Sequence, residues 1–295
     1  MTKTIDPNIH PQFDNLIKYA IAPRPICFAS TVDKTGNINL SPFSYFNFMS
    51  HNPAICVFSP LRRMRDGSTK HTIENIKEVP EVVINIVNYA MVQQQSLAST
   101  EYPKGINEFH KSGLTPVPSE LVTPPRVAES PVQLECKVRE VIELSDAPGA
   151  GNLVLAEVLR MHVHKTLLDE NNHIDQAKLD LVARLGGDWY CRVTADSLFQ
   201  VAKPLRNLGM GIDQLPRHIR LSSILTGNHL GKLGNVETLP SEEEVAALRG
   251  DEEIRDIINA FIGDKAALQI HLHRKAAELL DMGEVYKAWR VLLLV

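Results

Sequence analysis

The feature that most constrains the fold is a pair of strand-forming segments joined by a short turn near the N-terminus. Residues 26–32 are apolar and contain β-branched side chains, a pattern that predicts a buried strand. Residues 33–36 end in Gly36, and glycine adopts the positive φ that a short hairpin loop with a bulge requires. The sequence therefore predicts a β-hairpin here and, with the strand-like runs that follow, a mainly β fold.

The second segment of this hairpin, residues 38–48, alternates polar and aromatic residues and contains Pro42. Proline has no N–H to donate, so we expect this strand at the edge of a sheet or broken at Pro42. Two interpretations follow. An interrupted edge leaves backbone groups free to bind a flat, hydrogen-bonding ligand. Alternatively, the proline only protects an ordinary edge strand from aggregation.

The composition excludes several kinds of partner. The chain has 295 residues, a net charge of −4 and 44% hydrophobic residues. No basic stripe is present, so we expect neither nucleic acid nor an anionic membrane surface as a partner. Residues 1–15 lack the apolar core of a signal peptide, and the apolar run 291–295 is far shorter than the ~20 residues of a membrane span. We therefore predict a cytoplasmic protein.

Four cysteines are spread widely along the chain and form no Cys-x-x-Cys pair. They are Cys27, Cys56, Cys136 and Cys191. Three of them lie in strand-like apolar runs, which favours buried free thiols in a reducing compartment over a disulfide scaffold.

A short helix is predicted over residues 69–77, with Ser68 or Thr69 as its N-cap. Hydroxyl groups and Lys70 at the start of this helix favour a phosphate, because the free N–H groups and the helix dipole both attract an anion. The alternative is plain capping with solvated basic side chains.

Two long antiparallel strands are predicted over residues 131–144 and 153–165, joined by a glycine-containing loop. This loop opens no helix, so it is not a dinucleotide-binding fingerprint. His162 and His164 share one face of the second strand, but without a nearby third ligand we expect no metal site. The sequence contains no catalytic triad or paired-carboxylate motif, which is the pattern expected when a cofactor supplies the chemistry.

Several segments between residues 10 and 203 resemble the flavin reductase-like family, including flavoredoxin-type proteins. They are Pro-Arg-Pro-Ile at 23–26, S-T-x-D-x-x-G-x-x-N-L-S-P-F-S-Y-F-N at 30–47, Lys70-His71-Thr72, Phe109 to Thr115, and Arg184 to Tyr190. The resemblance implies an FMN-binding split β-barrel with peripheral helices. His71 and Glu108 depart from the family, which often has aspartate and in some members lysine at these positions.

The resemblance also implies a set of FMN contacts. Lys70 and Thr72 would hold the phosphate, with Ser59 and either Arg62 or Arg63. Asn152 would reach the edge of the isoalloxazine ring. Trp189 or Tyr190 would stack near it, or would be a core aromatic at a barrel corner. The complete predicted set is Thr31, Asn39, Ser41, Pro42, Phe43, Ser44, Tyr45, Ser59, Arg62, Lys70, Thr72, Asn152, Trp189 and Tyr190.

A second region begins after the predicted domain of residues 1–203. Alternation ends near Pro204, and residues 204–295 read as helical, with Ser241 and Asp251 each starting a helix. A third helix has His271 on its apolar stripe, where we expect a packed histidine. Such short helices are marginal alone, so we expect this extension to pack on the barrel or on a partner subunit.

The resemblance leaves three functional hypotheses. In the first, an NADH- or NADPH-dependent flavin reductase passes hydride from the nicotinamide to FMN, in a homodimer that serves an acceptor protein or a monooxygenase. In the second, the protein is an FMN electron carrier without a nicotinamide site. In the third, it is a non-catalytic split-barrel binding module.

Overall fold

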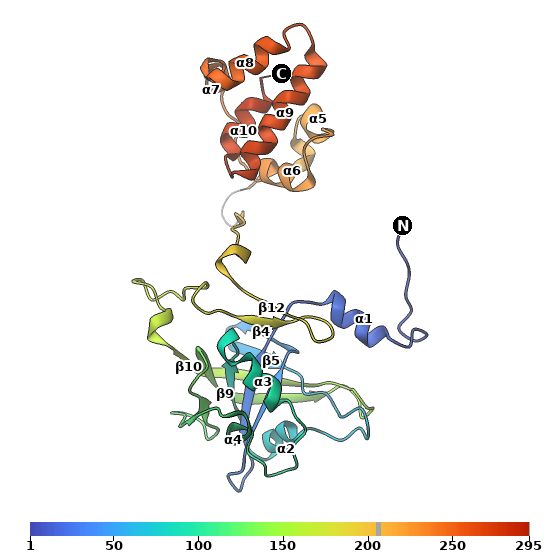
Figure 1. The fold of residues 1–295 in the computed structure, drawn as a ribbon, viewed down its shortest axis with the longest axis vertical. Helices are drawn as coiled ribbons and strands as arrows, with labels where there is room; N and C mark the ends of the chain where they lie inside the picture. The colour runs from blue at the N-terminus through green and yellow to red at the C-terminus, as the bar shows by residue number, and fades with distance from the viewer. Residues whose placement is uncertain (205–207, 295) are drawn as a thin grey trace. The chain divides into compact units, whose positions relative to one another are not determined.

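The computed structural model describes residues 1–204 and 208–294. The chain separates into two compact units, Met1–Phe199 and Gln200–Val295 (Figure 1). The first unit is built around a large antiparallel sheet with peripheral helices, and the described residues of the second unit form helices and connecting loops. The predicted mainly β fold with a helical C-terminal region is confirmed. No helix among the described residues is long and apolar enough to cross a lipid bilayer.

Among the described residues, seven strands form the main sheet, in the order β3-β2-β6-β9-β10-β5-β4. Their bounds are β2 (Cys27–Val32), β3 (Ile38–Phe43), β4 (Phe46–His51), β5 (Ala54–Phe58), β6 (Glu81–Ile86), β9 (Val132–Glu143) and β10 (Asn152–Val163). A smaller sheet joins β1 (Arg24–Pro25), β11 (Val182–Arg184) and β12 (Tyr190–Arg192), and β7 (Pro116–Val117) pairs with β8 (Arg126–Val127). The helices of this unit are α1 (Phe13–Ala20), α2 (His71–Glu78), α3 (Val92–Ala98) and α4 (Glu108–Ser112).

The predicted hairpin is the β2–β3 pair, and Gly36 has a φ of +89° in its turn. Pro42 lies in β3 at the edge of the sheet, as expected for a residue without an N–H. The predicted segment 38–48 lies at an edge as expected, but the strand breaks after Phe43 and not at Pro42. Ser44 and Tyr45 separate β3 from β4, which pairs with β5 at the opposite edge. Polar and apolar residues continue to alternate through these two residues. The sequence pattern therefore does not show that the chain passes here from one edge of the sheet to the other.

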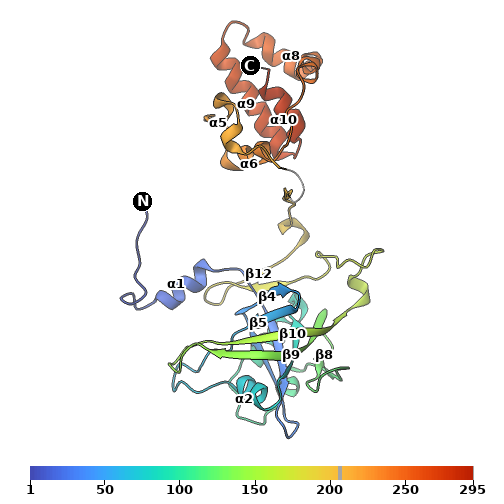
Figure 2. The ribbon, with the colours of Figure 1, turned by 180° about the vertical axis from the view of Figure 1, so that it is seen from behind.

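Strand β2 is buried on both faces. Successive side chains of a strand point to opposite faces of the sheet, so Cys27 and Ala29 pack in one apolar cluster while Phe28 packs in another. Cys56 and Cys136 are buried in the same cluster as Cys27, and burial raises the pKa of all three thiols. The predicted free cysteines are confirmed, except that Cys191 is only half-buried. The predicted long hairpin is also confirmed as β9 and β10 (Figure 2).

The second unit contains α5 (Arg217–Arg220), α6 (Gly227–Gly234), α7 (Glu242–Ala247), α8 (Glu252–Ala260), α9 (Lys265–Asp281) and α10 (Val285–Leu292). The predicted starts of two helices are confirmed. Ser241 accepts a hydrogen bond from the Glu244 N–H at the start of α7, and Asp251 accepts one from the Ile254 N–H at the start of α8. These side chains satisfy N–H groups that have no partner within the helix.

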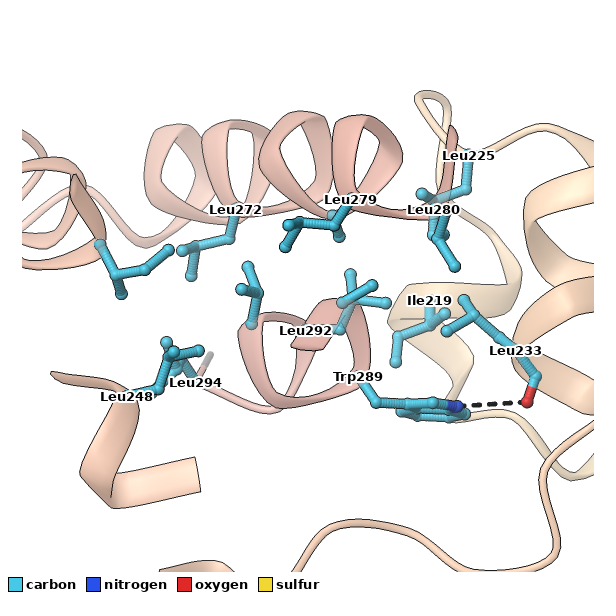
Figure 3. Packing of buried hydrophobic residues seen from close by; sticks show 14 of the residues in the cluster. Ile219, Leu225, Leu233, Leu248, Leu272, Leu279, Leu280, Trp289, Leu292 and Leu294 are labelled. Atoms are coloured by element: carbon cyan, nitrogen blue, oxygen red, sulfur yellow. Dashed lines mark hydrogen bonds between the residues drawn. The ribbon is translucent and has the colours of Figure 1, made fainter. Parts of the chain in front are cut away.

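The helices of the second unit share an apolar core of their own (Figure 3). Trp289 is fully buried in this core, and its Nε1 donates a hydrogen bond to the Leu233 carbonyl at 3.2 Å. Sequence reasoning treated the helices as marginal because it did not recognise this shared core. His271 is packed as expected, because it is half-buried and stacks on Phe261, and the sequence did not reveal that the neighbouring His273 is more deeply buried. Packing on the barrel or on a partner subunit stays a prediction.

Candidate functional site

A groove lies in the first unit where the edge of the main sheet meets the start of α2. Residues from β3, from the segment before α2, from the segment after α3 and from α4 form its walls, so segments distant in the sequence meet here. The residues lining it are Asn39, Ser41, Arg63, Lys70, His71, Thr72, Ala98, Ser99, Thr100, Glu101, Tyr102 and Glu108. Among the described residues, two further hollows adjoin it and share His71 with it.

Side chains from the helices bond to the free edge of β3. The Asn39 amide donates to the Thr72 hydroxyl of α2 at 3.1 Å, and the Glu108 carboxylate of α4 accepts from the Leu40 N–H at 2.9 Å. An edge strand has unpaired backbone groups on one side, and Glu108 satisfies one of them. Behind this edge, Asn75 donates to the hydroxyl of the fully buried Thr31. These bonds fix α2 and α4 against β3 and so define the groove.

The start of α2 carries no side-chain cap. Lys70 is the N-cap residue, and its side chain makes no capping hydrogen bond. The prediction that Ser68 or Thr69 is the N-cap is wrong, because Asp66 engages the Ser68 hydroxyl and backbone N–H in a local turn. The first N–H groups of α2 therefore receive no side-chain acceptor, which leaves the helix start suited to an anion.

Cationic side chains gather around this helix start. Arg63 donates to the Ser68 hydroxyl at 3.2 Å and to the Thr69 carbonyl, and its buried Nε has no hydrogen-bond partner among the described residues. Burial lowers the pKa of Lys70, and the nearby Glu101 carboxylate opposes that shift. Glu101 lies 3.8 Å from Arg63 Nε and 3.4 Å from Arg65 Nη1. The groove thus combines the cations Arg63 and Lys70 with the exposed Glu101 and the buried Glu108.

The structure brings several predicted site residues together. Asn39, Ser41, Lys70 and Thr72 all line the groove. Phe43 adjoins them, since Lys70 Nζ lies 5.7 Å from the centre of its ring. Thr31 lies behind the groove. Pro42 is half-buried within β3, and the half-buried Ser44 and Tyr45 follow that strand. Ser59 is buried, and its N–H donates to the Tyr45 carbonyl at 2.8 Å.

Other predicted residues lie outside the groove lining. Arg62 donates to Glu143 at 2.6 Å and to Asp146 at 2.8 Å, whereas the neighbouring Arg63 lines the groove. Asn152 is fully buried and donates to the Pro60 carbonyl at 2.7 Å. Trp189 is 73% exposed in the turn before β12, and the Tyr190 hydroxyl accepts from Arg184. As flavin contacts, all fourteen residues stay predictions.

The sequence indicated that the long connection after residue 100 could border a ligand, but it did not identify which residues line the groove. Ser99, Glu101 and Tyr102 follow α3 and carry no recognisable motif. Glu108 was noticed only as a departure from the family. Its burial, which raises its pKa, and its bond to Leu40 appear only in the folded chain. The one available signal was that a long connection beside a strand edge often borders a ligand.

Lys70 and Arg63 beside the uncapped start of α2 give the groove one end that is suited to an anion. The chain belongs to the family described as flavin reductase like domain, whose model matches residues 19–178. The resemblance stated from the sequence is confirmed. Membership supports a flavin-binding, reductase-type role, and with it an oxidoreductase role.

Solved structures agree with this assignment. The nitrilotriacetate monooxygenase component B from Bacillus cereus is 30% identical, with a TM-score of 0.63 over 68% of this chain and 99% of that one. The 2-nitrobenzoate 2-nitroreductase of Pseudomonas fluorescens is 27% identical, with a TM-score of 0.59 over 68% of this chain and 96% of that one. A Shewanella frigidimarina protein described as a flavin reductase with a split barrel domain is 24% identical, with a TM-score of 0.58 over 68% of this chain and 100% of that one. This last similarity supports the split-barrel fold alone.

Proposed function

We propose that the strand-rich unit, residues 1–203 as predicted, binds FMN in the groove and acts as an NADH- or NADPH-dependent flavin reductase. The observation that carries this proposal is the meeting of Asn39, Ser41, Lys70 and Thr72 in one groove. These residues were selected from the sequence as FMN contacts, and they come from β3 and from the start of α2. Family membership supplies the second support.

The phosphate of FMN would bind at the start of α2. Lys70 and Arg63 supply positive charge there, and the uncapped helix start supplies N–H groups. The buried Nε of Arg63 makes no hydrogen bond among the described residues, with Glu101 3.8 Å away, so an anion would satisfy this donor. Charge-assisted hydrogen bonds of this kind are shorter and about twice as strong as neutral ones. The residues present therefore fit a phosphorylated flavin.

The flavin ring would lie along β3 and the residues that follow it. When bound, FMN supplies the capacity to accept a hydride, so the protein needs no nucleophile of its own. The chain's residues would bind the ring, orient it and exclude water from one of its faces. Ser41 is suited to this role because its hydroxyl is small and lies in the lining. Pro42 leaves the edge of β3 without one backbone donor.

The electrons are proposed to leave the flavin for a partner enzyme. The Bacillus cereus neighbour is a component of a monooxygenase, so a monooxygenase or another acceptor protein is the kind of partner we propose here. We also propose a cytoplasmic location, since the described cysteines are free and three of them are buried. A reducing compartment keeps such thiols unpaired.

We further propose that two chains pair as a homodimer. Strand β4 forms the second edge of the main sheet, and it exposes Phe48 (46%) and Met49 (62%). Leu159 and Met161 of β10 are exposed as well. Large apolar side chains at an open sheet edge favour a protein partner. Sedimentation of the purified chain, compared with that of Met49→Lys, tests the pairing.

The experiment that tests the proposed function is a titration with FMN followed by anaerobic addition of NADH or NADPH. We expect FMN to perturb its own visible spectrum on binding and one or both nucleotides to bleach it. Bound flavin that neither nucleotide reduces would identify an electron carrier instead. A protein that leaves the FMN spectrum and its own melting temperature unchanged would be the non-catalytic module, and the proposal would be wrong.

A further inference from the structure

One residue lies at the centre of the groove and has no role in the proposal above. His71 is the first residue of α2, and it lines the groove and both hollows that adjoin it. One of these hollows also shares Asn39 with the groove, and the other also shares Arg63, Glu101 and Tyr102. A ligand that occupied any part of this connected space would come near His71.

The environment of His71 lowers the pKa of its imidazole and so favours the neutral form. Burial lowers its pKa, and Arg63 and Lys104 lower it further through charge repulsion, whereas Glu74 and Glu101 raise it. Both carboxylates already face other cations, because Lys104 lies 3.2 Å from Glu74 and Arg65 lies 3.4 Å from Glu101. Burial is the largest of these influences, so the pKa of His71 stays below its usual value despite the two carboxylates.

The ring nitrogens of His71 remain available to a ligand. Within residues 1–204 and 208–294, the imidazole makes no hydrogen bond to another protein group. The neighbouring side chains are engaged: Thr72 with Asn39, and Glu74 with Lys104. His71 is thus a titratable side chain in a cationic groove, beside an uncapped helix start, without a protein partner of its own.

A phosphate would reverse the charge balance around this side chain. A dianion beside an imidazole favours the protonated form and raises its pKa. We propose that His71 takes up a proton when a flavin phosphate binds, so that the phosphate is recognised more tightly as the pH falls through the neutral range. This inference rests on the proposed flavin site, and it assigns to His71 the recognition of a phosphate monoester.

Proton linkage sets the size and sign of the effect. Uptake of one full proton on binding changes affinity by at most about tenfold per pH unit. The phosphate itself loses its second negative charge near pH 6, which weakens binding at lower pH. Affinity should therefore rise from about pH 8 to about pH 6.5 and then level off.

The test compares FMN with riboflavin, which carries no phosphate, for the full chain and two variants. His71→Asn keeps a polar side chain that does not titrate. His110→Asn is the matched control, because His110 is exposed on α4 and does not line the groove. Dissociation constants are measured across this pH range. Calorimetry in two buffers of different ionisation enthalpy counts the protons taken up on binding.

We expect the wild type and His110→Asn to bind FMN more tightly as the pH falls and to take up a large fraction of one proton. We expect His71→Asn to show almost no slope for FMN, and riboflavin to show none with any chain. An unchanged slope in His71→Asn, or an equal slope for riboflavin, would overturn the assignment while leaving the flavin site intact. If neither flavin binds to any chain, the proposed function fails, and this inference fails with it.

Discussion

The two units bury polar side chains for different purposes. In the strand-rich unit, buried Asn39 and Thr72 bond to each other at the edge of the sheet, beside a groove. In the helical unit, the Ser222 hydroxyl bonds to buried His273, and His229 bonds to Asp281 at the end of α9. The first set shapes a surface that a ligand can reach. The second set holds a loop and a helix terminus in place.

Because of this difference, we expect that ligand binding by the strand-rich unit and the stability of the helical unit can be studied separately. Each unit has its own apolar clusters, one set around the main sheet and one around Trp289. Substitutions in the helical core should change the stability of that unit and leave flavin binding intact. Substitutions around the groove should change ligand affinity with little effect on unfolding. Each prediction below tests whether the stability of the helical unit and ligand binding by the strand-rich unit are independent.

The largest effect is expected for Trp289→Ala. Its side chain is fully buried in the helical core, and removing such an aromatic costs about 3–5 kcal/mol. The helical unit should unfold at a clearly lower temperature, as followed by circular dichroism. FMN affinity at a temperature where the helices are folded should match the wild type. A large loss of FMN affinity under that condition would contradict the division between the units.

A somewhat smaller effect is expected from pH on the helical unit. Burial lowers the pKa of His273 to about 4. An unfolded histidine titrates near 6.5, so between these values the unfolded state binds more protons, and stability falls as the pH drops from about 6.5 to about 4. The full loss is about 3 kcal/mol. Melting temperatures measured across this range should fall with pH.

The matched variants for that measurement are His273→Asn and His271→Asn. Asparagine cannot be protonated in this range, so the first variant should be less stable near neutral pH and should lose most of the pH slope. His271 is half-buried against Phe261, and its replacement should leave the slope in place. A slope that survives in His273→Asn would assign the effect to another group.

The next effect concerns the phosphate end of the groove. Lys70→Gln removes a charge from the lining, and loss of a charged hydrogen bond costs about 1.5–3 kcal/mol. FMN affinity should fall about 10- to 100-fold, while riboflavin affinity should hardly change. Lys77→Gln, on the exposed far end of α2, serves as the control. An equal loss of affinity for FMN and for riboflavin would show that Lys70 does not bind the phosphate.

The smallest effect is expected at Glu108. Burial raises the pKa of its carboxyl group, which shows that a charge there is unfavourable. Glu108→Gln keeps an oxygen for the Leu40 N–H, so the free energy of unfolding should change by less than about 1 kcal/mol. Glu108→Ala leaves that N–H without its acceptor and should cost about 1–3 kcal/mol. Similar losses in chemical denaturation for both variants would show that charge matters more than the bond.

Local patterns predicted much of the fold. Gly36 marked the hairpin turn, alternation marked β9 and β10, and Ser241 and Asp251 marked helix starts. Each of these signals acts over a few residues, because turns, caps and strand faces depend on neighbouring backbone geometry. Short motifs also led to the family, and through it to Lys70 and Thr72, which line the groove.

Other features depended on contacts between distant residues, and sequence patterns did not reveal them. Ser68 had been expected to cap α2, but its hydroxyl donates a hydrogen bond to Asp66 instead. Arg62 turned toward Glu143 while Arg63 lined the groove, although nothing in the sequence separates two adjacent arginines. The core that contains Trp289 forms between helices, and the apolar stripe of one helix does not show which other helix will cover it.

By itself, the sequence determined the family, the mainly β class of the first unit, the helical nature of the second, and the residue types available for a phosphate. Which of these residues lie together in one groove became apparent only from the folded chain. Burial and charge depend on what packs against a side chain in space, and a chain pattern does not carry that information. His71 therefore gained its significance from the groove in which folding places it.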